Sequence, residues 1–486
     1  MKTTRYTLLA AATILLTAVT ASAQVGHPFI HDPSTLAECD GKYYTFGTGQ
    51  GGLISDDGGY TWEGGAVRPG GGAAPDVIKI GDRYLIAYGA TGGGLGGSHS
   101  GRMLTMWNKT LDPQSPDFMY SDPVEVAGSV DGDDFDCIDP SLFFDPHTGR
   151  LWLTCGTYFG HIRLFELDPK TGARVEGNQP LDVAIDCEAS ALIYKDGWYY
   201  LLGTHGTCCD GVNSTYNIVC GRAKEVTGPY LDNVGRPMLQ GGGKMVAKAY
   251  GKAVGAGHFG RTVVTEGLEK MSFHWEADFE QGGMSTLAIR PLLWKNEWPE
   301  AGYPIEAGVY ELESQRHGYS LELAVDFQRL NVGRRRFGWQ PDEEPLSELP
   351  LQTLEDVQGS WPEGDIPVRN ADFMVRPHQK WQITPVEGKG GFLGAPYFKI
   401  TIAGTDRALC ATADKEVATV ATFSGADEQL WQIDQLTDGT YRIMPKAIPG
   451  TSERLCLISI ADSTPTLGPF DFTSDNSKWM LREIRD

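Results

Sequence analysis

Short apolar runs separated by tight turns recur along the first 300 residues of the chain. The clearest example is an apolar run over 189–194, an Asp-Gly pair at 196–197 and an aromatic run over 198–200. An Asp-Gly pair between two such runs predicts a β-hairpin with a two-residue turn. Comparable modules, each with an acidic residue or a histidine near its start, begin near His31, Ala74, Ile138, Cys187 and Gly257.

These five modules start 43, 64, 49 and 70 residues apart, and almost no helical periodicity lies between them. A propeller blade is a four-stranded unit of about 40 to 50 residues, with longer loops absorbing any excess. A β-sandwich would also give short strands, but it does not so readily repeat the same start, hairpin and aromatic return. We therefore expect an all-β fold in which residues 24–301 form a five-bladed β-propeller.

The pattern changes beyond Pro299, and we place a domain boundary near Gly302. Three tryptophans, Trp381, Trp431 and Trp479, are 50 and 48 residues apart and close similar stretches of sequence. This spacing predicts a threefold repeat in a second β domain over residues 302–486. An acidic, proline-containing insertion near 340–368 interrupts the first copy, and we expect it to form a surface loop.

The first 23 residues have the features of a signal peptide. Lys2 and Arg5 precede an apolar run over 8–19, and the small-residue triplet 21–23 resembles a cleavage site. The apolar run is too short to span a bilayer, which needs about 20 residues. We expect an exported protein, periplasmic or extracellular, with no membrane association after cleavage.

Charge and cysteine content restrict the partners. The formal net charge is −22, which argues against nucleic acid, because a polyanion needs a basic face. The only basic run is Arg334-Arg335-Arg336, and we interpret it as a solvated turn. The nine cysteines are an odd number, so at least one thiol lies outside any intramolecular disulfide pairing, which spacing does not reveal.

Four short motifs occur in a fixed order: His-Asp-Pro-Ser at 31–34, Cys-Ile-Asp-Pro-Ser at 137–141, Cys-Glu-Ala at 187–189 and Gly-Ala-Gly-His at 255–258. A longer one, Cys-Cys-Asp-Gly-Val-Asn-Ser-Thr-Tyr, covers 208–216. With these motifs the chain resembles glycoside hydrolase family 43, and within it the arabinan endo-1,5-α-L-arabinanases. The resemblance implies a five-bladed propeller.

The resemblance also implies an inverting hydrolase. Asp32 would be the general base, Glu188 the general acid, and Asp139 the group that tunes the pKa of the acid and orients it. Inversion needs two carboxyl groups far enough apart to admit a water on the far face of the sugar. The acid must stay protonated near neutral pH, which burial or a neighbouring carboxylate achieves by raising its pKa. A fourth acid, Asp76, has no implied role and is expected to be structural.

The family further implies a cation near the axial histidine, so we expect calcium close to His258, held through water. The substrate-binding residues that we expect are Tyr158, Phe159, Ser214, Tyr216 and Phe259. Family members usually carry tryptophan where this chain has Ala73, so one stacking wall of the sugar site is absent. Phe259 is unusual after the histidine, and we expect it to narrow the cleft or to supply a replacement ring.

Residues 302–486 resemble a ricin-type β-trefoil with a Gln-x-Trp motif in each repeat, although the third copy has Ser477 in place of Gln. Sugar binding in that family relies on an aspartate near each repeat start, where this chain has Glu322, Cys410 and Cys456. Two roles stay open for this domain, which are sugar binding and packing against the propeller.

The leading hypothesis is an exported endo-acting α-1,5-L-arabinanase whose substrate is plant cell-wall arabinan or its oligosaccharides. An exo-acting enzyme of the same family, such as an α-L-arabinofuranosidase, β-xylosidase or β-galactosidase, is the first alternative. The second is a catalytically silent glycan-binding protein. The set of Asp32, Asp139 and Glu188 argues against the second, because binding alone does not require three acids.

Overall fold

The computed structural model describes residues 24–49, 51–68, 72–91, 100–326 and 352–485. The expected signal peptide, residues 1–23, and the basic run 334–336 lie outside these ranges. Among the described residues no helix is both long and apolar enough to cross a membrane.

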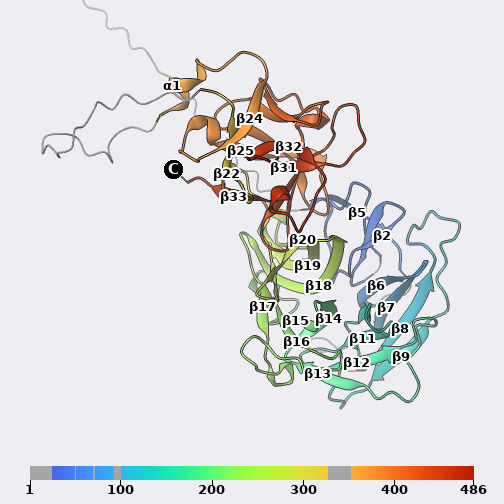
Figure 1. Ribbon diagram of the computed structural model, residues 1–486. Helices are drawn as coiled ribbons and strands as arrows, with labels where there is room; N and C mark the ends of the chain where they lie inside the picture. Colours follow the sequence, from blue (N-terminus) through green and yellow to red (C-terminus); the bar gives the residue numbers. More distant parts are fainter. Residues whose placement is uncertain (1–23, 50, 69–71, 92–99, 327–351, 486) are drawn as a thin grey trace, which may run out of the picture.

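The N-terminal part forms five sheets arranged as blades around one axis (Figure 1). Each blade has four antiparallel strands, and the first sheet also includes a short fifth strand from the N-terminal segment. The prediction of an all-β five-bladed propeller is confirmed. The first two blades are β2 (Ala37–Cys39), β3 (Lys42–Phe46), β4 (Gly52–Ser55) and β5 (Thr61–Ala66), then β6 (Ala73–Ile80), β7 (Arg83–Thr91), β8 (Gly101–Asn108) and β9 (Val124–Ser129).

The remaining three blades follow in sequence order, one sheet per module. They are β10 (Ser141–Phe144), β11 (Leu151–Cys155), β12 (His161–Leu167) and β13 (Leu181–Ile185); β14 (Glu188–Lys195), β15 (Trp198–His205), β16 (Asn217–Ala223) and β17 (Lys244–Ala247); and β18 (Ala253–Thr265), β19 (Leu268–Asp278), β20 (Met284–Lys295) and β21 (Trp298–Ala301).

The N-terminal segment closes the ring. β1 (Val25–Gly26) pairs in parallel with β5 of the first blade. Directly after it, the Ile30 N–H donates to the Ser285 carbonyl at 3.3 Å, and the Leu287 N–H donates to the Pro28 carbonyl at 2.8 Å. Because Ser285 and Leu287 belong to β20, this segment ties the first blade to the last.

Each blade has a residue with positive φ within its first strand or a few residues before it. These residues are Asp32 (51°), Ala74 (45°), Asp139 (55°), Ala189 (46°) and His258 (64°). Left-handed backbone is unfavourable for residues other than glycine, so packing must hold it in place. First strands of consecutive blades also contact one another, β2 with β6, β6 with β10, β10 with β14 and β14 with β18, which places these positions around the axis.

Asp76 lies two residues beyond the equivalent position of its blade. Its buried carboxylate accepts the backbone N–H of Thr35 at 3.1 Å and of Leu142 at 2.8 Å. Asp76 therefore joins the second blade to its two neighbours, which agrees with the structural role expected for it.

The C-terminal part is a closed six-stranded barrel with three hairpins, the arrangement of a β-trefoil, as predicted. The barrel strands are β22 (Gly308–Ser314), β25 (Trp381–Gly390), β26 (Pro396–Ile402), β29 (Trp431–Gln435), β30 (Tyr441–Pro445) and β33 (Trp479–Glu483). The hairpins are β23 (Ser320–Leu323) with β24 (Ile366–Ala371), β27 (Ala408–Ala411) with β28 (Val417–Val420), and β31 (Cys456–Ile460) with β32 (Thr464–Gly468).

The three tryptophans that revealed the repeat are equivalent in space. Each begins a barrel strand and is 0% exposed. Each indole N–H donates to a backbone carbonyl in or beside the hairpin of its own repeat, Trp381 to Leu321, Trp431 to Leu409 and Trp479 to Leu457, at 2.7 to 3.0 Å. The repeated residue therefore packs the core.

The insertion near 340–368 is not entirely a loop. Its described part contains the short helix α1 (Leu354–Gln358), and its end enters β24. Ile366 and Val368 alternate with exposed residues on this strand and pack into the trefoil core. Their period-2 pattern is that of a strand with one buried face, and the residues before 352 lie outside the described ranges.

The side chains at the positions that would carry sugar-binding aspartates in the trefoil are buried. Glu322, Cys410 and Cys456 are 3%, 7% and 0% exposed. The Glu322 carboxylate accepts hydrogen bonds from Arg369 at 2.7 Å and from Gln379 at 2.7 Å. These three side chains therefore support the fold of the domain.

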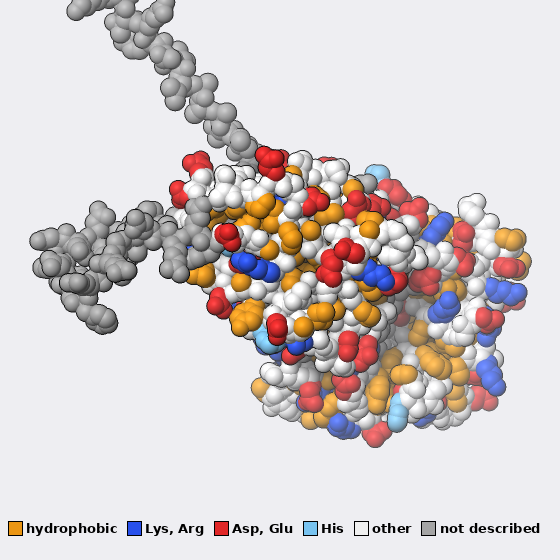
Figure 2. Space-filling model, turned by 45° about the horizontal axis from the view of Figure 1, so that its top comes forward, with side chains coloured by type: hydrophobic (Ala, Val, Ile, Leu, Met, Phe, Trp, Pro, Cys, Tyr) orange, Lys and Arg blue, Asp and Glu red, His pale blue; other side chains and the backbone are white. Residues whose placement is uncertain are grey.

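The two domains pack on each other along the last blade (Figure 1). The Trp294 N–H donates to the Thr437 carbonyl at 2.8 Å, and the Thr437 N–H donates to the Gly267 carbonyl at 2.9 Å. The expected boundary near Gly302 falls between β21 and β22. On the face shown in Figure 2, basic side chains are interspersed with acidic ones and form no continuous basic surface.

Candidate active site

Asp32 is held by side chains from three directions. Its Oδ2 lies 2.9 Å from His31 Nδ1 and also accepts a hydrogen bond from the Thr48 hydroxyl. Its Oδ1 lies 3.6 Å from His258 Nδ1. Burial favours the neutral carboxyl, but the imidazoles of His258 and His31 outweigh it and hold the pKa of Asp32 well below its usual range. Asp32 is therefore an ionised carboxylate.

Glu188 is in the opposite state. It begins β14 and is 6% exposed, and its Oε1 accepts a hydrogen bond from the hydroxyl of Tyr216. Burial raises the pKa of Glu188 far above its ordinary value, and the negative charges of Asp139 and Asp32 raise it further. Glu188 therefore carries a proton at neutral pH. The hydroxyl of Tyr216 binds Oε1 of Glu188 and not Oε2.

Asp139 lies between these two groups in the electrostatic network. The backbone N–H of Ala189, the residue after Glu188, donates a hydrogen bond to it. Burial raises the pKa of Asp139, and the charge of Asp32 adds to this effect. The three acids are thus close enough to shift one another's pKa. Asp32 is the ionised acid of the set, and Glu188 is the protonated one.

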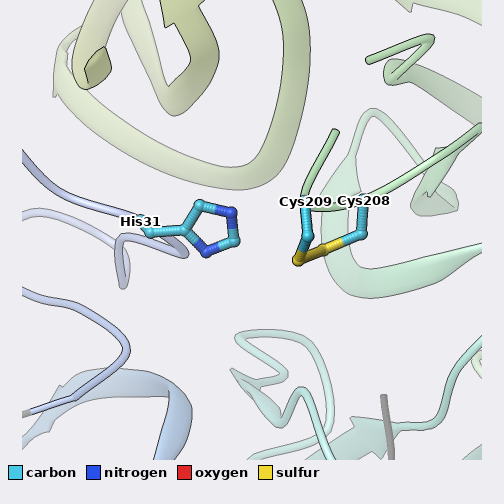
Figure 3. Close-up of side chains that lie close together, drawn as sticks. All are labelled: His31, Cys208 and Cys209. Atoms are coloured by element: carbon cyan, nitrogen blue, oxygen red, sulfur yellow. A yellow bond between two sulfur atoms is a disulfide. The ribbon is translucent and has the colours of Figure 1, made fainter. Parts of the chain in front are cut away.

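The segment 206–216 forms one side of this site. The backbone N–H of Cys209 donates to Glu276 Oε1 at 3.1 Å, and Tyr216 at its other end binds Glu188. Cys208 and Cys209 are joined by a disulfide, which lies beside the His31 ring (Figure 3). The other seven cysteines, all described and all buried, are free.

A glycine permits the close approach of Tyr216. A Cβ added to Gly257, the residue before His258, would lie 2.7 Å from Cδ2 of the Tyr216 ring. Any larger residue there would push the tyrosine away from Glu188.

The model of glycosyl hydrolases family 43 matches residues 53–304, which is more than half of the chain. The chain belongs to glycosyl hydrolases family 43. The model of the ricin-type β-trefoil lectin domain-like family matches residues 377–451.

Two relatives within family 43 differ in their mode of action. The extracellular exo-α-(1→5)-L-arabinofuranosidase of Cellvibrio japonicus is 33% identical over 245 residues, 47% of this chain and 69% of the relative. The extracellular endo-α-(1→5)-L-arabinanase 1 of Bacillus subtilis is 35% identical over 190 residues, 37% of this chain and 55% of the relative.

A solved structure supports the fold. The crystal structure of an exo-1,5-α-L-arabinanase from a bovine ruminal metagenomic library is 30% identical and has a TM-score of 0.53. The match covers 60% of this chain and all of that one. This chain is accordingly a family 43 glycoside hydrolase with a trefoil domain.

Two of the substrate-binding candidates of this family 43 domain lie together near the acid. Tyr158 and Phe159 have ring centroids 4.5 Å apart, and Phe159 is 44% exposed. Burial raises the pKa of Tyr158, as does the charge of Glu188. Phe159 is thus the exposed member of an aromatic pair in which Tyr158 interacts electrostatically with Glu188.

The other candidates are placed differently. Ser214 is buried, and its hydroxyl donates to the Thr207 carbonyl at 2.7 Å, so it shapes the segment 206–216. Tyr216 is 5% exposed and contacts Glu188 through its hydroxyl rather than offering its ring to solvent.

Phe259 does not line the cleft, contrary to our expectation. Its ring is 5% exposed and packs with Phe273 and Trp275 in the core between the last two blades. Adjacent strand residues point to opposite faces, so with His258 directed at Asp32 the following ring is directed into the sheet packing.

The calcium ion expected near His258 would need a suitable set of ligands around it. Among the described residues, no group of three His, Cys, Asp or Glu side chains with ligating atoms within 4.8 Å of one another includes His258. Calcium takes six to eight oxygen ligands. The protein groups around His258 therefore do not form a direct calcium cage, and an ion there would be bound through water.

Three further residues of the site had no role in the sequence-based prediction. His31 belongs to the Asp32 motif, and His274 and Glu276 are polar residues two apart on the buried strand β19, where they alternate with the apolar residues Phe273, Trp275 and Ala277. The Asp32 backbone N–H donates to His274 Nδ1 at 3.2 Å, and His31 Nε2 lies 3.1 Å from Glu276 Oε1. Two polar side chains on one face of a buried strand were the available signal.

Proposed function

We propose that this family 43 hydrolase cleaves α-1,5-linked L-arabinan by single displacement with inversion. The observation that carries the proposal is the different surroundings of two acids in one site: Asp32 is paired with His31 and lies beside His258, whereas Glu188 is buried and bound by the Tyr216 hydroxyl. An inverting glycosidase needs this pair, a base for water and an acid for the leaving oxygen.

In the proposed reaction, Asp32 activates the attacking water. Oδ2 is engaged by His31 and Thr48, so Oδ1 is the oxygen available to take the proton. Glu188 has Oε1 engaged by Tyr216, so Oε2 delivers its proton to the glycosidic oxygen. Burial keeps Glu188 protonated, and the negative charge of Asp139 adds to this effect. Tyr158 and Phe159 provide a stacking surface for the arabinan chain.

We propose internal cleavage as the mode of action, and the endo-acting relative from Bacillus subtilis supports it. Exo action is the second candidate, because the relative from Cellvibrio japonicus and the ruminal metagenomic enzyme are named as exo-acting. Ala73 bears on this choice, since it leaves one side of the site without a bulky ring.

We further propose that a hydrated calcium ion lies beside His258. Its buried Nδ1 has no hydrogen-bond partner, which leaves it free to bind a water molecule. Dialysis against a chelator followed by calorimetric titration with calcium tests this proposal, and an absence of binding heat would refute it.

Export and a plant cell-wall substrate complete the proposal. Both relatives described above are named as extracellular, which supports the signal peptide expected over residues 1–23. Detection of a mature protein that begins at Gln24 outside the cytoplasm is the corresponding measurement.

The deciding experiment is a time course of products from debranched arabinan, with xylan, arabinogalactan and aryl glycosides of arabinose, xylose and galactose alongside. Early arabino-oligosaccharide ladders are expected for endo action, whereas monosaccharide or one short product alone would establish exo action. Proton NMR of the first product should show the inverted anomer, and retention would overturn the mechanism. No product from any substrate would overturn the assignment.

A further inference from the structure

Glu276 is a buried carboxylate beside the catalytic acids, and the proposed mechanism gives it no task. It lies on β19 and is 5% exposed. Its Oε1 accepts the backbone N–H of Cys209 at 3.1 Å and lies 3.1 Å from His31 Nε2. Burial of an ionised carboxylate is costly unless it is paired, and the His31 ring is its charged partner.

His31 joins Glu276 to Asp32. Its Nε2 faces Glu276 and its Nδ1 faces Asp32 Oδ2 at 2.9 Å. A ring with a carboxylate at each nitrogen is an imidazolium that donates both of its protons. Burial lowers the pKa of His31, but the two carboxylates outweigh it and raise the pKa to about 10.

A second route runs from Glu276 to the backbone of Asp32. His274 Nδ1 accepts the Asp32 N–H at 3.2 Å, so the proton of this neutral ring is on Nε2. Nε2 lies 3.5 Å from Glu276 Oε1. Glu276 is thus next to both the ring that holds the Asp32 side chain and the ring that holds its backbone.

This bonding pattern argues against a metal at the same residues. His31, His274 and Glu276 have ligating atoms within 4.8 Å of one another. A ligating nitrogen needs a free lone pair, but both nitrogens of His31 carry protons and Nδ1 of His274 already accepts a hydrogen bond. The cluster is therefore an ion-pair network.

We propose that Glu276 is a positioning residue for the general base, acting on Asp32 through His31. The proposal rests on the proposed function, in which Asp32 activates water. With Glu276 in place the His31 ring is anchored at both ends, Oδ2 stays occupied, and Oδ1 keeps its direction toward the water. Without it the ring rotates and the strained residue Asp32, at φ 51°, loses a restraint.

The test is Glu276→Gln, which keeps the size of the side chain and removes its charge. A misdirected base loses part of the roughly 10²- to 10⁴-fold that acid–base catalysis contributes, so we expect kcat to fall about 10- to 100-fold. KM should stay within about twofold of wild type, because Glu276 lies behind His31 and does not reach the sugar.

A double-mutant cycle separates positioning from a general structural role. His31→Ala removes the side-chain connection and leaves only the contact through His274, so adding Glu276→Gln to it should lower kcat much less than Glu276→Gln does alone. The matched control is Glu269→Gln on the same strand, a carboxylate that is 4% exposed and bound to Lys195 and Arg261 away from the site. The control should leave kcat unchanged.

Multiplying effects of the two substitutions, or a raised KM with unchanged kcat, would overturn the positioning role. Thermal melts are run on every variant. Where Glu276→Gln unfolds at the assay temperature, Glu276→Asp keeps the charge but shortens the reach, and the same loss in kcat is expected from it. Asp32→Ala tests the base independently, because activity retained there overturns the proposed function and not merely Glu276.

Discussion

The two domains are both built by repetition, yet they treat equivalent positions in opposite ways. In the trefoil, three equivalent positions hold the same residue making the same bond, as Trp381, Trp431 and Trp479 do. In the propeller, the five positive-φ positions hold Asp32, Ala74, Asp139, Ala189 and His258. The backbone is repeated in both domains, but the chemistry is repeated only in the trefoil.

This difference distinguishes the packing residues of a repeat from its candidate catalytic residues. Identical buried residues at equivalent positions satisfy the same packing requirement several times over. Different ionisable residues at equivalent positions converge on one axis, where their charges interact. Glu188 shows a limit of this rule, since it stands one residue before the equivalent position of its blade.

The largest effect is expected at the base. Asp32→Ala should lower kcat by about 10⁴-fold on arabinan and on aryl arabinosides alike, because no leaving group replaces the activation of water. Steady-state kinetics on both substrate types measures this. Residual turnover near the wild-type rate would contradict the assignment.

Glu188→Ala should separate protonation of the leaving group from activation of water. We expect a loss of about 10³-fold on arabinan, whose leaving oxygen needs a proton, and far less on an aryl arabinoside with an acidic phenol. Parallel assays of the two substrates measure the difference. Equal losses on both would contradict the acid role of Glu188.

A substitution in the trefoil core should lower the stability of that domain without changing catalysis. Trp431→Ala removes a fully buried side chain and should lower the free energy of unfolding of its domain by about 3–5 kcal/mol. Urea denaturation measures this, while kcat per folded molecule should remain that of wild type. A lower kcat in the folded fraction would mean that the trefoil shapes the propeller site.

Asp139→Asn should move the pH profile. Glu188 must be protonated, so activity is lost as pH rises through its pKa. Removing the charge of Asp139 lowers that pKa, and the basic limb of kcat/KM should therefore shift to lower pH. Asp145→Asn is the control, since this buried acid of the same blade binds Thr148 and Tyr199 instead. An unmoved basic limb in Asp139→Asn would refute the tuning role.

The smallest effect is expected from Tyr216→Phe. It removes one hydrogen bond to Glu188 and leaves the ring packed, so kcat should fall about 10-fold or less. Kinetics on arabinan checks this. A loss as large as that of Glu188→Ala would instead assign Tyr216 a direct part in proton transfer.

The architecture and three of the ionisable residues of the site could be predicted from the sequence. Hairpin spacing predicted five blades, and tryptophan spacing predicted the trefoil, because local pairing rules leave a periodic trace in the chain. Asp32, Asp139 and Glu188 stood at module starts in short motifs. The structure brings all three into one electrostatic network.

The neighbours of these acids that come from other blades could not be predicted from the sequence. His31 and Glu276 are 245 residues apart in the chain and meet because the first and last blades are adjacent in the closed ring. The sequence did not show that Phe259 turns into the core, because the direction of its ring follows from the neighbouring His258 pointing at Asp32 of another blade. The local sequence pattern determines strands and turns, whereas contacts between residues far apart in the chain determine the charge state of the site.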